Sequence, residues 1–159
     1  MYTEVRSQAK ASKDRYQLFK HALRLTKVPI LIALVLTPFR FMLELIGLPE
    51  NLIFIVGLLW LTLAFAIYWG VKIYKNKQAY LLLLLSLLIF SPISRIPVAI
   101  AWRVDTRWEI GTHYGLYFDS WGQALWNHVV YGSLVQIIPG LFLGSITLAI
   151  MRYRKSAKH

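Results

Sequence analysis

The chain of 159 residues contains no cysteine and no recognised catalytic motif, and both absences narrow its chemistry. Without a thiol it forms no disulfide, thiolate metal site or iron–sulfur cluster, and it carries out no thiol redox chemistry. The sequence also lacks a Gly-x-Ser-x-Gly elbow, a Ser/His/Asp spacing and a glycine-rich phosphate loop. It therefore indicates neither an activated nucleophile nor a nucleotide site. The absence of cysteine leaves the cellular compartment undetermined.

Acidic residues are scarce: seven Asp and Glu stand against 18 Lys and Arg, which gives a formal net charge of +11. A nucleic-acid-binding domain would carry such a charge on one soluble face. Here most of the basic residues lie before residue 28, between residues 72 and 77, and after residue 151. Basic clusters that flank apolar runs are typical of the cytoplasmic segments of membrane proteins. The charge therefore indicates topology, and we expect no nucleic-acid partner.

Long apolar runs account for much of the sequence, and hydrophobic residues make up 57% of it. A soluble protein of this size could not bury so much apolar surface, whereas a bilayer solvates it. Crossing a hydrocarbon core of about 30 Å takes roughly 20 helical residues. Four runs reach that length, at 28–48, 52–73, 79–102 and 128–151. We therefore predict an all-α integral membrane protein with four transmembrane helices.

The charges of the connecting segments orient these helices. The link 47–51 has no Lys or Arg, the link 74–78 is basic, and the segment 103–127 is nearly neutral. The positive-inside rule then predicts an N-in/C-in topology, with a basic juxtamembrane segment at 1–27 and a basic cytoplasmic tail at 152–159. Compact size and this charge bias favour a bacterial inner (cytoplasmic) membrane, although an organelle membrane would show a similar pattern.

Residues 12–27 have the pattern of an N-terminal amphipathic helix. Tyr16, Phe19 and Leu23 recur at helical spacing, and basic residues occupy the other faces. Such a helix before a span usually lies on the anionic inner leaflet. Docking to a protein partner is the alternative.

The predicted outer segment between the third and fourth helices is rich in Trp and Tyr. These side chains prefer the headgroup level, where the ring is half buried and its polar tip stays wet. We therefore predict an aromatic-rich outer interfacial segment that lies along the membrane. Within it, Ser120 followed by Gln123 has the form of a capping box. This predicts that the last helix begins near Trp121, before it enters the hydrocarbon.

Ionisable residues within the spans are the most informative ones for function. Arg40 and Glu44 lie four apart and share a helix face, and Arg95 lies between two prolines on the third helix. At about 1.5 Å per residue, Arg40 is about 18 Å from the inner end, and Glu44 and Arg95 are each about 24 Å from it. Because a charge in hydrocarbon is costly unless it is paired or hydrated, these groups should face the bundle interior. With Ser94 and Gln136 they form a predicted polar cluster that opens toward the outer face.

This cluster has three interpretations. The first is packing between helices through polar side chains. The second is a binding site for a polar or anionic headgroup or a quinone, and the third is a path for protons or ions. The excess of arginine over glutamate favours an anion if both arginines face inward. No cofactor is predicted, and a bound lipid or quinone is compatible with the cluster.

A second set of polar residues lies on the predicted outer face, at His113, Tyr114, Asp119 and His128. Two histidines and a carboxylate can bind zinc or iron if the loop folds back over the helix. Their spacing matches no known metal motif, so we predict no metal site. A turn between glycines that places His113 and Tyr114 at the membrane interface is the simpler interpretation.

Three functions fit these features. The absence of a catalytic motif and of a soluble domain favours a non-catalytic accessory or scaffold subunit of a larger membrane complex. The alternative is a small protein that binds or transports a lipid-like or quinone-like amphiphile through the outer-half polar cluster. The third is a membrane-embedded enzyme that uses the outer-face histidines and carboxylates. We expect the bilayer and other membrane subunits as partners; the form Gly140-x-x-x-Gly144 is typical of contacts between membrane helices.

Overall fold

The computed structural model describes residues 2–157 and the side chains of 12–49, 51–53 and 55–157. Within these residues every regular element is a helix. Four stretches are long and apolar enough to cross a membrane: Ser12–Leu45, Asn51–Ile73, Ala79–Trp108 and Trp121–Ser156. This confirms the predicted all-helical fold with four helices that are long and apolar enough to cross a membrane. The last two residues of the predicted basic tail lie outside the described residues.

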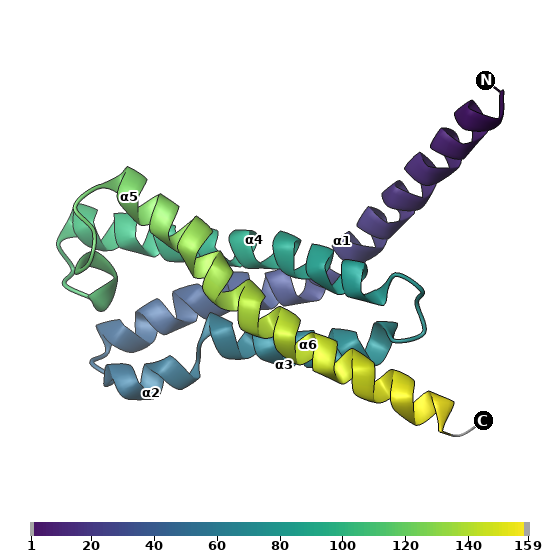
Figure 1. The fold of residues 1–159 in the computed structure, drawn as a ribbon. Helices are drawn as coiled ribbons and strands as arrows, with labels where there is room; N and C mark the ends of the chain where they lie inside the picture. The colour runs from purple at the N-terminus through teal and green to yellow at the C-terminus, as the bar shows by residue number, and fades with distance from the viewer. Residues whose placement is uncertain (1, 158–159) are drawn as a thin grey trace.

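The long helices run side by side and have short elements at one end (Figure 1). We call the end with α2, η1 and α5 the aromatic end, and the end with the 74–78 loop, the start of α1 and the end of α6 the basic end. In chain order the elements are α1 (Tyr2–Leu45), α2 (Glu50–Ile55), α3 (Leu58–Ile73), α4 (Ala79–Trp108), the 3-10 turn η1 (His113–Gly115), α5 (Trp121–Trp126), the π-helical turn η2 (Asn127–Tyr131) and α6 (Gly132–Ser156).

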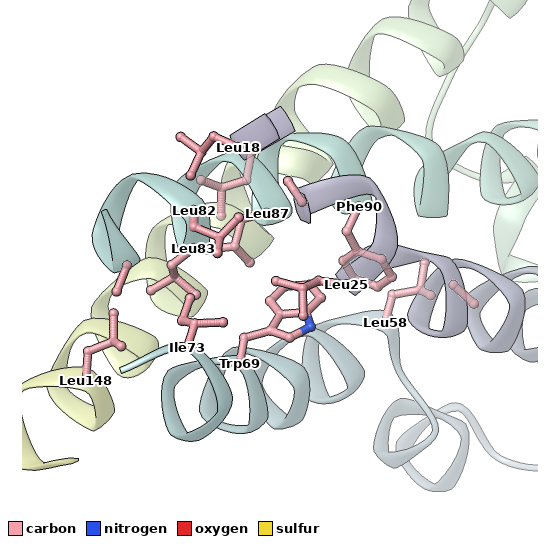
Figure 2. Packing of buried hydrophobic residues seen from close by; sticks show 14 of the residues in the cluster. Leu18, Leu25, Leu58, Trp69, Ile73, Leu82, Leu83, Leu87, Phe90 and Leu148 are labelled. Carbon is pink, nitrogen blue, oxygen red and sulfur yellow. The ribbon is translucent and has the colours of Figure 1, made fainter. Parts of the chain in front are cut away.

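The predicted amphipathic helix and the first span form one continuous helix, α1. The chain continues as helix because no glycine or proline occurs before Pro29. Leu18 and Leu25 are buried among side chains of the bundle, which holds this segment against α4 (Figure 2). The predicted face of Tyr16, Phe19 and Leu23 is exposed instead. A separate amphipathic helix is therefore not seen, and its apolar face remains available to the surroundings.

The second span is interrupted, whereas the sequence predicted one helix over 52–73. α2 ends at Ile55 with Val56 as its C-cap, and Gly57 takes an extended conformation (φ −119°, ψ 150°) as the N-cap of α3. Glycine is a poor residue for a helix interior, which makes it the weakest point of this run. Irregular backbone at membrane depth is tolerated where protein or water covers its polar groups. We therefore expect the backbone at this break to face protein or water and not lipid.

α4 continues six residues beyond the predicted 79–102 and ends at Trp108, followed by the C-cap Glu109, which has a left-handed backbone (φ 50°). The chain then turns back over the end of the bundle. The buried carboxylate of Asp105 accepts a hydrogen bond from the backbone N–H of Thr112 at 2.9 Å. Gly115 lies against the same carboxylate, with no room for a Cβ. The predicted interfacial segment 103–127 is thus partly helical and partly folded onto the bundle.

The last helix begins at Trp121, as predicted from the cap. The Ser120 hydroxyl oxygen accepts the backbone N–H of Gln123 at 3.3 Å, so Ser120 is confirmed as the N-cap. The helix then widens into the π-helical turn η2 before continuing as α6. Single π-turns within α-helices are rare and occur frequently at functional sites. The predicted apolar span 128–151 therefore starts inside this π-helical turn.

Small residues bring α6 into close contact with α3 and α4. A Cβ on Gly70 would lie 2.8 Å from the Cβ of Thr147, and one on Gly144 would lie 2.8 Å from Leu83. The Gly140-x-x-x-Gly144 motif is therefore used inside this chain. Large apolar side chains fill the rest of this half: Trp69 packs edge-on against Phe90, with ring centroids 6.2 Å apart (Figure 2).

Arg152 joins α6 to the loop at the basic end. Its Nε donates to the carbonyl of Tyr74 at 3.2 Å, and its Nη2 donates to the carbonyl of Asn76 at 2.9 Å. We expect Arg152→Gln to destabilise the protein by about 1–3 kcal/mol because charge-assisted bonds to both carbonyls are lost. Thermal unfolding in detergent measures this, with Arg154→Gln, an exposed position on the same helix, as the control. Equal melting temperatures for the two variants would show that the contact contributes nothing.

Candidate functional site

A cavity of about 310 Å³ lies at the aromatic end of the bundle. It is bordered by α1, the start of α3, α4, the chain around η1, and the η2–α6 helix. Small-molecule sites in proteins occupy about 300–1,000 Å³, so the cavity has the size of a headgroup or small ligand site. Its wall consists of Arg40, Gly57, Leu58, Leu59, Trp60, Arg95, Val98, His113, Tyr114, Tyr117, Phe118, His128 and Val135.

Two arginines from different helices reach this cavity. Arg40 comes from α1 and Arg95 from α4, and the Nε atoms of both are buried without a hydrogen-bond partner. Among the described residues, neither guanidinium lies within 4 Å of a carboxylate oxygen. A Cβ on Gly132 would lie 3.1 Å from the Nε of Arg95 and 3.2 Å from its Cζ. The Arg95 guanidinium therefore rests close to the backbone at the start of α6, where a side chain at position 132 would push it aside by at least a few tenths of an ångström.

Glu44 pairs with a histidine rather than with an arginine. Its Oε2 lies 2.5 Å from the Nδ1 of His113, and its side chain is only 8% exposed. The sequence had placed Glu44 and Arg95 at one depth and suggested that they meet. In the structure the loop after α4 folds back and supplies His113 instead. This pair ties η1 to α1 and leaves the arginines without an acidic partner among the described side chains.

Ser94 and Gln136, the other two members of the predicted polar cluster, lie apart from the cavity. Both are buried, and the Ser94 hydroxyl is 3.3 Å from the Oε1 of Gln136. The same hydroxyl donates to the carbonyl of Ser91 at 2.8 Å. These two residues therefore link α4 to α6 in the bundle interior and do not line the wall.

Three of the four predicted outer-face residues are in the wall. Tyr114 is buried, its ring centroid lies 5.7 Å from that of Phe41, and its hydroxyl has no partner. Burial, more than any neighbouring charge, raises the pKa of Tyr114, so the phenol stays a neutral donor. His128 packs edge-on against Phe118, with centroids 5.2 Å apart, and its Nε2 is buried without a partner. Asp119 is exposed and lies outside the wall.

The histidines and carboxylates do not gather around a common point. In the part of the chain that the structure describes, no three His, Asp or Glu side chains are placed to hold a metal ion. His113 is directed to Glu44, and His128 comes from the π-helical turn on another wall of the cavity. The two histidines therefore contribute to the cavity as separate hydrogen-bonding side chains.

The start of α3 is a part of the site that sequence reasoning missed. Gly57 and the first turn of α3 lie in the wall. The first amides of a helix have no carbonyl one turn earlier to bond, and Gly57 offers no side-chain cap. The helix dipole adds partial positive charge at the same place. In the sequence, only Gly57, a glycine within an apolar run, indicated that the helix could break here.

No protein-family model, curated protein or solved structure matches this chain.

Proposed function

We propose that this chain is a small integral membrane protein that binds a lipid-like or quinone-like amphiphile, with the polar head in the cavity at the aromatic end. One observation carries the proposal: the wall combines aromatic and aliphatic side chains with buried polar atoms that have no partner within the described chain. Buried polar groups in proteins are normally hydrogen-bonded, and each one left alone costs about 1–3 kcal/mol. A polar headgroup in the cavity would satisfy them.

The rim of the cavity suits the tail of such a molecule. Trp60, Tyr117 and Val135 all contribute to the wall and are 51%, 66% and 56% exposed. They come from α3, the loop after η1, and α6. Glycines hold α3 and α6 together further along, and the two helices diverge toward the aromatic end (Figure 1). An opening between them would face the hydrocarbon, so an apolar tail could extend from the cavity into the bilayer.

The proposed orientation is N-in/C-in in a bacterial inner membrane, with the cavity in the outer half of the bilayer. The start of α1, the end of α6 and the 74–78 loop lie at the same end (Figure 1). Lys75 and Lys77 in that loop add to the basic charge of this end, which supports a cytoplasmic placement. The exposed face of Tyr16, Phe19 and Leu23 on α1 would then contact the inner leaflet.

The accessory-subunit function stays a prediction. Exposed apolar side chains along α1 and α6, such as Val35 and Phe142, fit a neighbouring membrane helix and lipid equally well. The membrane-embedded enzyme that uses the outer-face histidines and carboxylates also stays a prediction.

Native mass spectrometry of the protein, purified in a mild neutral detergent, tests the proposed function. We expect the wild type to retain an amphiphile and Val98→Phe to lose at least about tenfold in occupancy, since a buried wall residue then fills the cavity. Ile138→Phe is the matched control because Ile138 is 66% exposed on α6. A protein that carries no amphiphile but retains a stoichiometric protein partner would contradict the proposal and favour the accessory subunit.

A further inference from the structure

We infer that the headgroup bound in this cavity is an oxyanion of the phosphate or carboxylate class, held by Arg40 and Arg95 together. This inference rests on the proposed function and specifies the chemistry of its ligand. It excludes neutral amphiphiles, including quinones, as the preferred occupant.

The charge of the wall is the first argument. An arginine guanidinium is a cation that offers five N–H donors and no acceptor. No carboxylate lines the cavity within the described residues, because Glu44 lies outside the wall and pairs with His113. Charges removed from water require a counter-charge or hydration. Of the candidate headgroups, only an anionic one offsets both arginines.

Further hydrogen-bond donors in the wall are the second argument. The Tyr114 side chain is 4% exposed, lines the cavity, and has a hydroxyl without a partner. The backbone around Leu58 and Leu59 contributes the uncapped first turn of α3. Helix N-termini bind phosphate and carboxylate through such amides. The donors of the two arginines, of Tyr114 and of this turn match an oxyanion, which offers only acceptors when it is fully ionised.

The placement of Arg95 is the third argument. Its guanidinium lies against Gly132, where a Cβ would approach to 3.1 Å. This contact, rather than an acidic partner, fixes the position of the guanidinium beside the cavity. A larger residue at 132 would displace the guanidinium while leaving both positive charges in the chain. Gly122 provides a matched control, because a Cβ there meets no atom within 4 Å.

Binding of three probes to the full-length protein in neutral detergent, measured by calorimetry, tests the inference. The probes are dihexanoyl phosphatidic acid, dihexanoylglycerol with the same tails, and inorganic phosphate. We expect phosphatidic acid to bind at least about tenfold more tightly than dihexanoylglycerol. Arg40→Gln and Arg95→Gln should each remove this preference, whereas Arg103→Gln, at an exposed position on α4, should retain it.

Gly132→Val and Gly122→Val keep the inference testable if an arginine variant fails to fold. The first should weaken phosphatidic acid binding while helical content by circular dichroism is unchanged, and the second should not. Equal affinity for phosphatidic acid and dihexanoylglycerol, unaffected by the arginine variants, would overturn the oxyanion inference and leave the proposed function standing. Binding of inorganic phosphate without phosphatidic acid would support the oxyanion and overturn the amphiphile. Binding of none of the three would overturn the inference, and the native mass spectrum would then decide the proposed function separately.

Discussion

Gly144→Leu is expected to prevent stable packing of α6 on α3 and α4 and to destabilise the protein by about 3 kcal/mol or more. Even the first atom of a side chain at Gly144 would lie 2.8 Å from Leu83 and 3.1 Å from the backbone oxygen of Ala66. A backbone oxygen in a packed helix cannot move aside as a flexible side chain can. Helix association in membranes depends on such close packing, because lipid is as apolar as the helices themselves.

Loss of helical circular dichroism on heating in detergent measures this effect. Gly122→Leu is the control, since a Cβ at Gly122 meets no atom within 4 Å. A Gly144→Leu protein that melts together with the Gly122→Leu protein would show that the crossing of α3 and α6 is not close in solution.

His113→Leu is expected to have the second large effect, a destabilisation of about 3 kcal/mol. The Glu44 side chain is 8% exposed, and its Oε1 already has no partner. Removing His113 leaves this carboxylate buried without any partner, which costs more than the pair itself contributes. The double variant Glu44→Leu/His113→Leu removes the charge too, and we expect it to be more stable than the single variant.

Unfolding of the two single variants and the double variant, compared with the wild type, measures the coupling between the residues. A double variant whose loss equals the two single losses added together would mean that the pair does not form. The variant His21→Leu, at an exposed position on α1, controls for the change of residue type.

The four helices that are long and apolar enough to cross a membrane could be predicted because an apolar run of about 20 residues has few other stable environments. The start of the last helix was predictable because its capping contacts are local. The Ser120 hydroxyl accepts the backbone N–H of Gln123, and the side-chain oxygen of Gln123 accepts the backbone N–H of Asp119. The burial of the first part of α1 was not predictable, because Leu18 and Leu25 join a buried cluster with residues of other helices, such as Trp69 and Leu87. The break at Gly57 and the π-helical turn at Asn127–Tyr131 were not predicted either.

Individual site residues were predictable, whereas their grouping was not. Arg40 and Arg95 were identified because a charge within a span is costly and must face the protein interior. The partner of Glu44 was missed because depth was counted along straight helices and the following loop was assigned to the membrane surface. That loop folds back because the Asp105 carboxylate contacts Thr112 and Gly115, and no local sequence pattern predicts this contact.

The close crossing of α3 and α6 has a mechanical consequence. Gly70 lies near the C-terminal end of α3 and Gly144 in the second half of α6, so the stretch from Gly144 back to His128 extends away from this crossing. It is about 24 Å long at the helical rise of 1.5 Å per residue. If it turned as a rigid rod about the crossing, a rotation of about 5° would displace His128 by about 2 Å. The contacts of Gln136 with Ser94 and of Gly132 with Arg95 lie along this stretch and oppose such a rotation, so they also help to hold the width of the cavity.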